Sequence, residues 1–477
     1  MKIKNIVKVL LVAFILASCA PAAKVVPTET IVSATTFTSI PPTSTITPTP
    51  IPTIDIEGQS IPDPHFTNPE LFDLQNPKSP IPQFIKAMSM AGIEISPENV
   101  IQQITYQKLT QANGKPYIVG LYNLDPDSSK TGETLEGEIP LLLAFQDNND
   151  FWVWKKTTIG NFSNMIAINS GTLLEGAGSS MFETLEKVET ENFNYGMVTT
   201  HQGLSTAAYT YDYGYSDVEI DMGVKSKMPL MSHMLVWSSV IPDWLASGNY
   251  SDKEIMEIMT HWITTTMKRY PQIKVWEVVN EAYNNDFFQR KLGDDYIVEF
   301  YKIARNARPD ADLIYNDYSN HSTIDTSLEN GQRTLHTIKI IEKLKKENLI
   351  DGVGVEMVIY ADKLPPTYAD ITSTLKSYGI PVYVTEFAVI MTNVSGSKEQ
   401  RWLKQADIYY GIVRAVLESK VCNTIIYFNQ TDTNSPWEIQ KELYEYSVNA
   451  DPTLFDDNFN PKPAYYAVIQ ALYKPLP

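Results

Sequence analysis

From about Asn161 to its C-terminus, the chain alternates eight times between a short apolar, strand-like run and a helix-like segment. The strand-like runs read MIAINSG, NYGMVTT, LMSHMLVW, VWEVVN, DLIYNDY, GVGVEMVIY, VYVTEFAV and NTIIYFNQ. Eight strand–helix units predict an α/β fold, a (β/α)8 TIM barrel over residues 161–477. A doubly wound sheet would alternate in the same way, but no Gly-rich phosphate loop follows the first run. The barrel is therefore the favoured architecture.

The clearest helix of this region begins after Ser251. Glu254 follows three residues later, which is the pattern of a capping box. Apolar residues then recur at helical spacing and predict one face that packs on the sheet. They are Ile255, Ile258, Met259, Trp262, Ile263 and Met267.

Residues 1–19 have the features of an export signal. Three lysines precede the apolar run Val9–Ala17, which is too short to span a bilayer. The run leads into Leu16-Ala17-Ser18-Cys19, which resembles the bacterial lipoprotein signal, and that resemblance implies lipidation of Cys19. The alternative is an ordinary cleaved secretory peptide. Either interpretation predicts an extracellular protein, as a cell-surface lipoprotein or in secreted form.

Two further segments precede the predicted barrel. Residues 20–57 are rich in Thr, Pro and Ser and predict a disordered linker. Residues 58–160 contain one helix-like stretch, PIPQFIKAMSMAGI, and the strand-like runs YIVGLYNL, IPLLLAF and FWVWKK, so we expect a small accessory α+β region. Its aromatic residues Phe151, Trp152 and Trp154 could stack on a glycan, but strand alternation favours a place in the core.

The composition of the chain indicates which classes of ligand and partner it can bind. The formal net charge is −18, so attraction to nucleic acid is not expected, and contact with a membrane is expected only through a lipid anchor. The six histidines show no HExxH motif or paired ligand spacing, so neither a catalytic metal nor a cofactor is predicted. A neutral polymer or a small ligand is the better candidate.

Two glutamates stand at the predicted C-terminal strand ends, where barrels carry their working residues. The fourth strand ends in Asn280–Glu281 and the seventh in Thr385–Glu386. They are 386 − 281 = 105 residues apart, close to three strand–helix units, which predicts opposed strands. Two carboxyl groups facing one sugar bond are what glycosidic cleavage requires, and a separation of ~5–5.5 Å gives retention of configuration.

Several motifs make the resemblance specific. WEVVNEAY and VTEFAV resemble the acid/base and nucleophile motifs of glycoside hydrolase family 10, the endo-β-1,4-xylanases. HMLVWSSVIPDWL, IYNDYS and FDDNFNPKPAYYAV are similar to its third strand, fifth strand and C-terminal signature. The resemblance covers residues 163–473.

This resemblance implies roles for individual residues. Glu281 would be the general acid/base and Glu386 the nucleophile of a retaining, endo-acting enzyme on β-1,4-xylan or a related plant β-glycan. The residues implied to contact sugar are Asn280, His233, Trp237, Trp437, Tyr318, His201 and Gln202. His233 could instead be a satisfied barrel histidine, and the two tryptophans could serve only in packing.

The sequence also departs from the family pattern. Where the family's second strand has Glu, Asn and Lys, this chain has His201, Gln202 and Ser205. Ser238 replaces a histidine of the third-strand motif. On the sixth strand the family's Gln and His become Glu356 and Val358, and the resemblance implies that this His bonds the nucleophile.

The departures leave two alternatives open. One is a retaining barrel glycosidase on another β-1,4-glycan or a decorated oligosaccharide. The other is a barrel that binds glycan without cutting it. The presence of both glutamates favours an enzyme.

Overall fold

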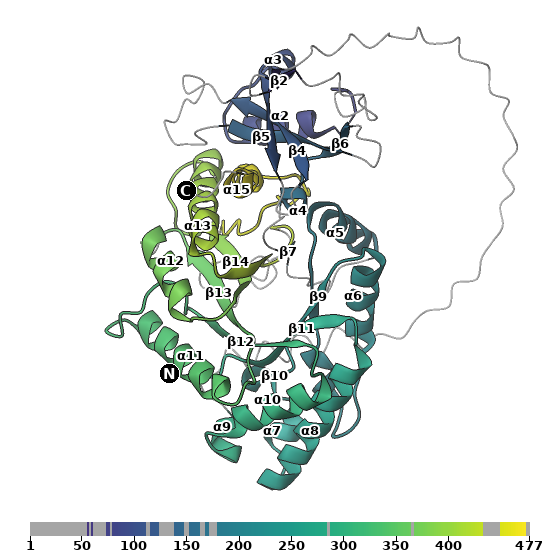
Figure 1. Cartoon of the computed structure of the whole chain (residues 1–477), viewed down its shortest axis with the longest axis vertical. Coiled ribbons are helices and arrows are strands. Elements are labelled where there is room, and N and C mark those ends of the chain that lie inside the picture. The colour runs from purple at the N-terminus through teal and green to yellow at the C-terminus, as the bar shows by residue number, and fades with distance from the viewer. Residues whose placement is uncertain are drawn as a thin grey trace, which may run out of the picture. The chain divides into compact units, whose positions relative to one another are not determined.

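The structure is a computed structural model of the whole chain (Figure 1). It describes residues 55–56, 59–60, 73–76, 79–110, 115–123, 138–146, 152–162, 167–170, 179–283, 287–363, 367–432 and 449–473. The predicted signal 1–19 with Cys19, nearly all of the predicted linker 20–57, and Trp437 lie outside these ranges. Within the N-terminal unit Met1–Asp63, strands β1 (Asp55–Ile56) and β2 (Gln59–Ser60) pair in antiparallel fashion.

A parallel sheet with eight strand positions forms the centre of the second unit, Pro64–Pro477. The chain visits them as β7 (Ala167–Ser170), β8 (Gly196–Thr199), β9 (Leu230–His233) with β10 (Val236–Trp237), β11 (Ile273–Asn280), β12 (Asp312–Tyr318), β13 (Gly352–Tyr360), β14 (Val382–Ile390) and β15 (Cys422–Tyr427). β9 and β10 share the third position, and both pair with β11. β7 pairs with β15 and also contacts β8, so the sheet is nearly closed, which confirms the predicted (β/α)8 barrel.

Helices surround this sheet (Figure 1). They are α5 (Ser179–Asn192), α6 (Gly214–Lys225), α7 (Asp243–Ala246), α8 (Asp252–Arg269), α9 (Phe287–Leu292), α10 (Tyr296–Ala307), α11 (Glu329–Lys345), α12 (Tyr368–Ser377), α13 (Lys398–Ser419) and α15 (Pro463–Tyr473). The capping box of α8 is present, with both bonds between Ser251 and Glu254 formed. The six predicted apolar residues of α8 are all buried. Helical periodicity therefore identified the face that packs on the sheet.

The barrel interior is filled with side chains. One buried cluster takes residues from most of the strands, as expected for a packed barrel core. Its members are Tyr195, Met197, Met231, Val275, Ile314, Tyr383 and Ile426. This core leaves the strand ends as the place for chemistry.

The region before the barrel is an antiparallel sheet with short helices. It consists of α2 (Pro80–Met90), α3 (Pro97–Gln102), β3 (Ile104–Thr110), β4 (Pro116–Asn123), β5 (Glu138–Gln146), β6 (Trp152–Lys156) and α4 (Ile159–Phe162). β3 is an edge strand that we did not predict, because its polar residues hide the apolar alternation. Trp152 and Trp154 are buried, in agreement with a core role, while Phe151 lies outside the described residues.

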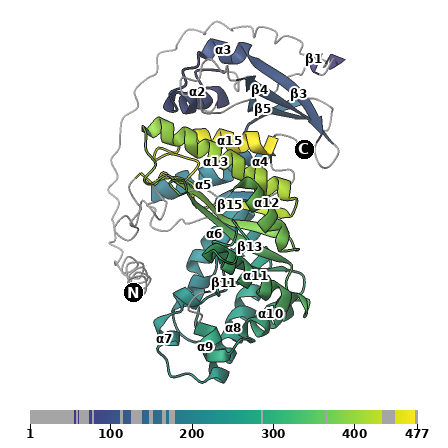
Figure 2. The same cartoon turned by 90° about the vertical axis from the view of Figure 1, so that its left-hand side faces the viewer.

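This sheet packs on α15, the last helix of the barrel region (Figure 2). The ring of Phe84 meets that of Tyr466 edge-on with centroids 5.2 Å apart, and the Tyr473 hydroxyl bonds Gln107. α15 itself lies against α13. The accessory sheet and α13 therefore both pack against α15.

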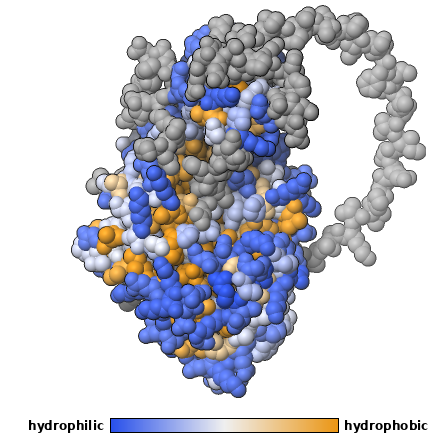
Figure 3. Space-filling view, viewed as in Figure 1, coloured by the Kyte–Doolittle hydropathy of each residue, from blue (hydrophilic) through white to orange (hydrophobic). Residues whose placement is uncertain are grey.

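The face of the molecule in Figure 3 carries mainly hydrophilic side chains over the helices α7 to α10, with smaller hydrophobic patches between them. Charged residues there are the outward faces of helices whose apolar sides are buried. Among the helices of the described ranges, none combines the length and the apolar character needed to cross a lipid bilayer.

Candidate active site

Glu281 and Glu386 are placed by two strands of the barrel. Glu281 follows the last residue of β11 with a left-handed backbone, φ 48°. Our prediction that the seventh strand ends at Glu386 was wrong, because β14 continues to Ile390. Irregular pairing of β14 with both neighbouring strands occurs around Glu386. A bulge of this kind can re-aim a side chain at an active site.

His233, at the end of β9, links Glu386 to a second, deeply buried acid. Its Nδ1 lies 2.9 Å from Oε2 of Glu277, and its Nε2 lies 3.6 Å from Oε1 of Glu386. The side chain of Glu277 is 0% exposed and that of Glu386 is 13% exposed. Burial alone would lower the pKa of His233, but the carboxylates of Glu277, Glu386 and Glu281 raise it to about 9. At neutral pH His233 is therefore a cation beside Glu386.

Glu281 has different neighbours. Nε1 of Trp237 donates a hydrogen bond of 3.1 Å to its Oε2. Burial, together with the charges of Glu386 and Asp317, raises the pKa of Glu281 to about 8. Burial also raises the pKa of Glu386, but the charge of His233 opposes the rise and the value is about 7.

The two carboxyls are thus unequal. The His233 cation is the main influence that lowers the pKa of Glu386, whereas for Glu281 the charges of Glu386 and Asp317 outweigh that of His233, so as the pH rises Glu386 loses its proton first. Opposed protonation of two neighbouring carboxyls identifies an acid and a base or nucleophile. The geometry supports a protonated Glu281 and an ionised Glu386.

A network of amides connects the strands around this pair. Oγ1 of Thr385 donates to Oδ1 of Asn316 at 2.6 Å. Nδ2 of Asn316 donates to Oδ1 of Asn280 at 2.9 Å and to Oε1 of Glu356 at 2.8 Å. These bonds fix the Asn280 amide with its oxygen turned to Asn316. Its Nδ2 is therefore the end that can donate a hydrogen bond to a ligand.

The structure places the remaining predicted site residues as follows. The ring of His201 lies edge-on to Trp237, with centroids 6.3 Å apart, and burial lowers the pKa of His201 to about 3, so it is neutral. Gln202 follows in the same short 3-10 helix, His201–Ser205. Tyr318 ends β12, and the guanidinium of Arg333 lies 4.0 Å from its ring centroid.

The departures from the family pattern lie close to this cluster. Ser238 begins the 3-10 helix that follows Trp237. Val358 packs against the buried apolar cluster of Ala388 and its neighbours, so it gives Glu386 no polar contact. The cation near Glu386 comes instead from β9.

Sequence reasoning missed three polar residues that shape the site. They are Glu277, Asn316 and Asp317. The hydroxyl of Tyr315 donates a hydrogen bond of 2.5 Å to Oδ2 of Asp317. The same hydroxyl accepts a hydrogen bond of 3.2 Å from the backbone N–H of Ala282, the residue after Glu281. The available signal was a charged or amide residue inside an otherwise apolar strand.

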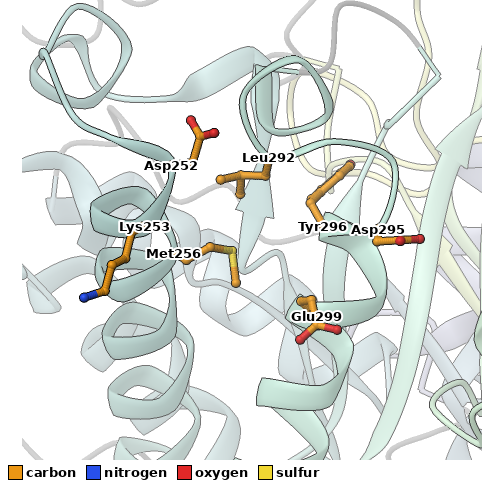
Figure 4. Close-up of a pocket in the computed structure, with 7 residues that line it drawn as sticks. All are labelled: Asp252, Lys253, Met256, Leu292, Asp295, Tyr296 and Glu299. Carbon is orange, nitrogen blue, oxygen red and sulfur yellow. The ribbon is translucent and has the colours of Figure 1, made fainter.

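A separate hollow of about 330 Å³ lies among the outer helices α8, α9 and α10 (Figure 4). Asp252, Lys253 and Met256 line one side, and the other side includes Tyr296 and Glu299. It shares no residue with the carboxyl cluster. Within the described part of the chain, no three His, Cys, Asp or Glu residues are arranged to hold a metal ion.

A nearly closed parallel barrel with two unequal carboxyls, one directly after β11 and one at the irregular pairing within β14, is the arrangement of a barrel glycoside hydrolase. The model of glycosyl hydrolase family 10 matches residues 165–471, and the chain belongs to this family. It is an endo-1,4-β-xylanase-like glycoside hydrolase.

Similar proteins carry the name endo-1,4-β-xylanase. The chain is 28% identical over 277 residues to endo-1,4-β-xylanase B of Thermotoga neapolitana, covering 56% of this chain and 76% of that protein. It is 28% identical over 331 residues to endo-1,4-β-xylanase 1 of Gibberella zeae, covering 63% and 89%. The solved structure of xylanase 10B from Thermotoga maritima is 25% identical with a TM-score of 0.58, covering 66% and 98%. Xylanase 10B of Thermotoga petrophila, solved with xylobiose, is 25% identical with a TM-score of 0.59, covering 67% and 98%.

Proposed function

We propose that this protein hydrolyses internal β-1,4 bonds of xylan with retention of configuration. Glu386 is the nucleophile and Glu281 the general acid/base. The observation that carries the assignment is the cation of His233, whose Nε2 lies 3.6 Å from Oε1 of Glu386, while burial and the charges of Glu386 and Asp317 outweigh the effect of the same cation on Glu281. Family membership and the xylanase relatives support the substrate.

The reaction proceeds in two displacements. In the first, a carboxylate oxygen of Glu386 attacks the anomeric carbon while the bond to the leaving oxygen breaks, and Glu281 gives its proton to that oxygen. In the second, the ionised Glu281 takes a proton from water, and the hydroxyl displaces Glu386 from the anomeric carbon. Glu281 ends protonated and Glu386 ionised, as at the start.

Neighbouring residues hold the sugar in this proposal. Asn280, through its Nδ2, bonds the 2-hydroxyl at the cleavage point, and His233 and Trp237 contact the same ring. His201 and Gln202 contact the next sugar on the non-reducing side. Tyr318 lines the leaving-group side, and the family resemblance implies a contact of Trp437 with the cleaved sugar.

Release of reducing ends tests the function. Purified protein is incubated with xylan, β-glucan and mannan, and we expect new reducing ends from xylan, with short oligosaccharides as products of internal cleavage. Glu386→Ala should abolish turnover, and azide should restore it with a glycosyl azide of inverted configuration. An azide product of retained configuration would remove Glu386 from the nucleophile role.

A second candidate is a retaining glycosidase for another β-1,4-glycan or a decorated oligosaccharide. His201 is neutral and is followed by Gln202 and Ser205, where the resemblance implies Glu, Asn and Lys. Such a change alters recognition of the glycone without touching the two acids. Cleavage of β-glucan or mannan, with xylan left intact, favours this candidate, and binding without any cleavage favours a glycan-binding barrel.

We also propose that the enzyme works outside the cell, attached through a lipidated Cys19 and the Thr/Pro-rich linker 20–57. The signal-like N-terminus and the composition of the linker support this location. Growth with a radiolabelled fatty acid should label the wild-type protein and leave Cys19→Ala unlabelled. A secreted, unlabelled wild-type protein would contradict the anchor.

A further inference from the structure

A third carboxyl, which the mechanism above does not use, stands beside the nucleophile. Glu356 on β13 is the cross-strand partner of Glu386 on β14. Residues paired across neighbouring strands direct their side chains to the same face of a sheet, so both carboxyls enter the same interior space. Glu356 is only 6% exposed.

The groups around Glu356 are mainly acids, and they come from every strand packed near it. In falling order of influence they are Glu386 of β14, Glu281 after β11, Asp317 of β12 and Glu277 of β11. The hydrogen bond to its carboxyl comes from the neutral amide of Asn316, 2.8 Å from Oε1. His321 bonds the backbone oxygen of Glu356, and burial lowers the pKa of this histidine to about 4, so it adds no positive charge.

The two partners therefore differ in what stabilises a negative charge. Glu386 has the His233 cation at 3.6 Å, whereas Glu356 has an amide and four acids. When two carboxyls share a site, one of them keeps its proton. Burial and the charges of the surrounding acids raise the pKa of Glu356 well above its usual range, in agreement with this geometry.

We propose that Glu356 is a positioning residue that works as a neutral carboxylic acid beside Glu386, so that the pair carries one negative charge and this charge rests on the nucleophile. A protonated carboxyl has nearly the shape of a carboxamide and can donate one O–H hydrogen bond. Ionised, the same group would repel the charge on Glu386 and raise its pKa. The inference rests on the proposed role of Glu386.

The sign of the pH dependence of stability is fixed by this proposal. In the unfolded chain Glu356 ionises near ~4.3, whereas in the folded protein it stays protonated to a higher pH. Its folded-state pKa is raised, so wild type loses stability as the pH rises above the unfolded value. The Gln side chain of Glu356→Gln cannot ionise, so the variant does not undergo this loss of stability with rising pH.

The decisive experiment compares urea unfolding of wild type and Glu356→Gln from pH 4 to pH 8. The ratio of their unfolding constants should grow about tenfold per pH unit above ~4.3 in favour of the variant, until the folded-state pKa is reached. Glu342→Gln, on the exposed face of α11, is the matched control and should give a ratio that does not depend on pH. A pH-independent ratio for Glu356→Gln would overturn the proposal.

Kinetics supply the second readout. Because the amide and the protonated acid carry the same charge, the acid limb of kcat/KM on xylan should stay in place in Glu356→Gln. If Glu356 were ionised in the working enzyme, the variant would lose a negative neighbour of Glu386, and the acid limb would fall by about one pH unit or more, which refutes the proposal. Wild type that cleaves no glycan would refute the proposed function instead, and the unfolding data would still decide the state of Glu356.

Should Glu356→Gln not fold, infrared spectroscopy on protein labelled with ¹³C-carboxyl glutamate replaces it. In Glu281→Gln at pH 8, a protonated glutamate carboxyl should remain visible by its C=O stretch. Absence of a protonated glutamate band at pH 8 in this variant, where Glu386 is ionised, would show an ionised Glu356 and overturn the inference.

Discussion

Replacing Glu277 by Gln tests whether a buried acid controls the nucleophile from a distance. Glu277 is 0% exposed, so it cannot touch a substrate, and its Oε2 lies 2.9 Å from Nδ1 of His233. Its charge is the largest influence that keeps the buried imidazole protonated. In Glu277→Gln the burial of His233 prevails, and we expect the imidazole to be neutral at neutral pH.

The size of the effect follows from the distance between His233 and Glu386. Two unit charges 3.6 Å apart attract by about 4–5 kcal/mol at an effective dielectric constant of ~20, and this is an upper limit on what Glu386 loses. Since 1.36 kcal/mol equals one pKa unit, the pKa of Glu386 should rise by about one to three units. Glu277 itself raises the pKa of Glu386 by its charge, which reduces the net rise towards the lower figure.

The assay is the pH dependence of kcat/KM on xylan. For wild type, with Glu386 ionising near 7 and Glu281 near 8, we expect a maximum between pH 7 and 8. In Glu277→Gln the acid limb should move up by at least about one unit, with a tenfold loss of rate per unit on the acid side. An acid limb that stays in place or moves down would show that His233 keeps its proton without Glu277 and would refute the reasoning.

Three further variants test neighbouring parts of the structure. Trp237→Phe removes the 3.1 Å bond that lowers the pKa of Glu281, so the alkaline limb of kcat/KM should move up by about one unit, and an unchanged limb would contradict the contact. Gly354→Ala would place a Cβ 2.3 Å from Oδ1 of Asn316, so we expect about 1–3 kcal/mol of destabilisation in urea and at least a tenfold lower kcat, whereas wild-type kinetics would refute the role of this amide network. Lys462→Met removes the ammonium group that lies 3.0 Å from Oδ2 of the buried Asp432. The unpaired carboxylate should cost about 3–5 kcal/mol of unfolding free energy, measured by urea denaturation.

The barrel was predictable because its elements are local in origin. The capping box at Ser251 and the apolar face of α8 depend only on residues a few positions apart, and strand-like runs are recognised by their apolar content. Strand β3 was missed because Thr, Gln and Lys interrupt its pattern, and its place in the sheet comes from pairing with β4. The break between β9 and β10 was also missed, since both halves belong to one apolar run.

The site was predictable only in part. The two glutamates could be found because each follows a polar residue, Asn280 or Thr385, behind an apolar run, where a barrel carries its working residues. The partnership of His233 with Glu277 and Glu386 could not be found, because it joins three strands through side-chain distances that no spacing encodes. The protonation order of Glu281 and Glu386 depends on the same distances.

The departures around the nucleophile leave it with a cation, because His233 matches the family's third-strand motif and is kept. What Glu386 requires is a cation within a few ångströms, and Coulomb attraction does not depend on which strand supplies it. Val358 has become part of an apolar cluster, and His233 on β9 lies 3.6 Å from the nucleophile with Glu277 fixing its proton. Glu356 fits the same scheme only in its neutral form, since an additional fixed negative charge beside Glu386 would cancel what His233 contributes. The substitutions can therefore alter the surroundings of the nucleophile while its ionisation, and with it the two-step displacement, is preserved.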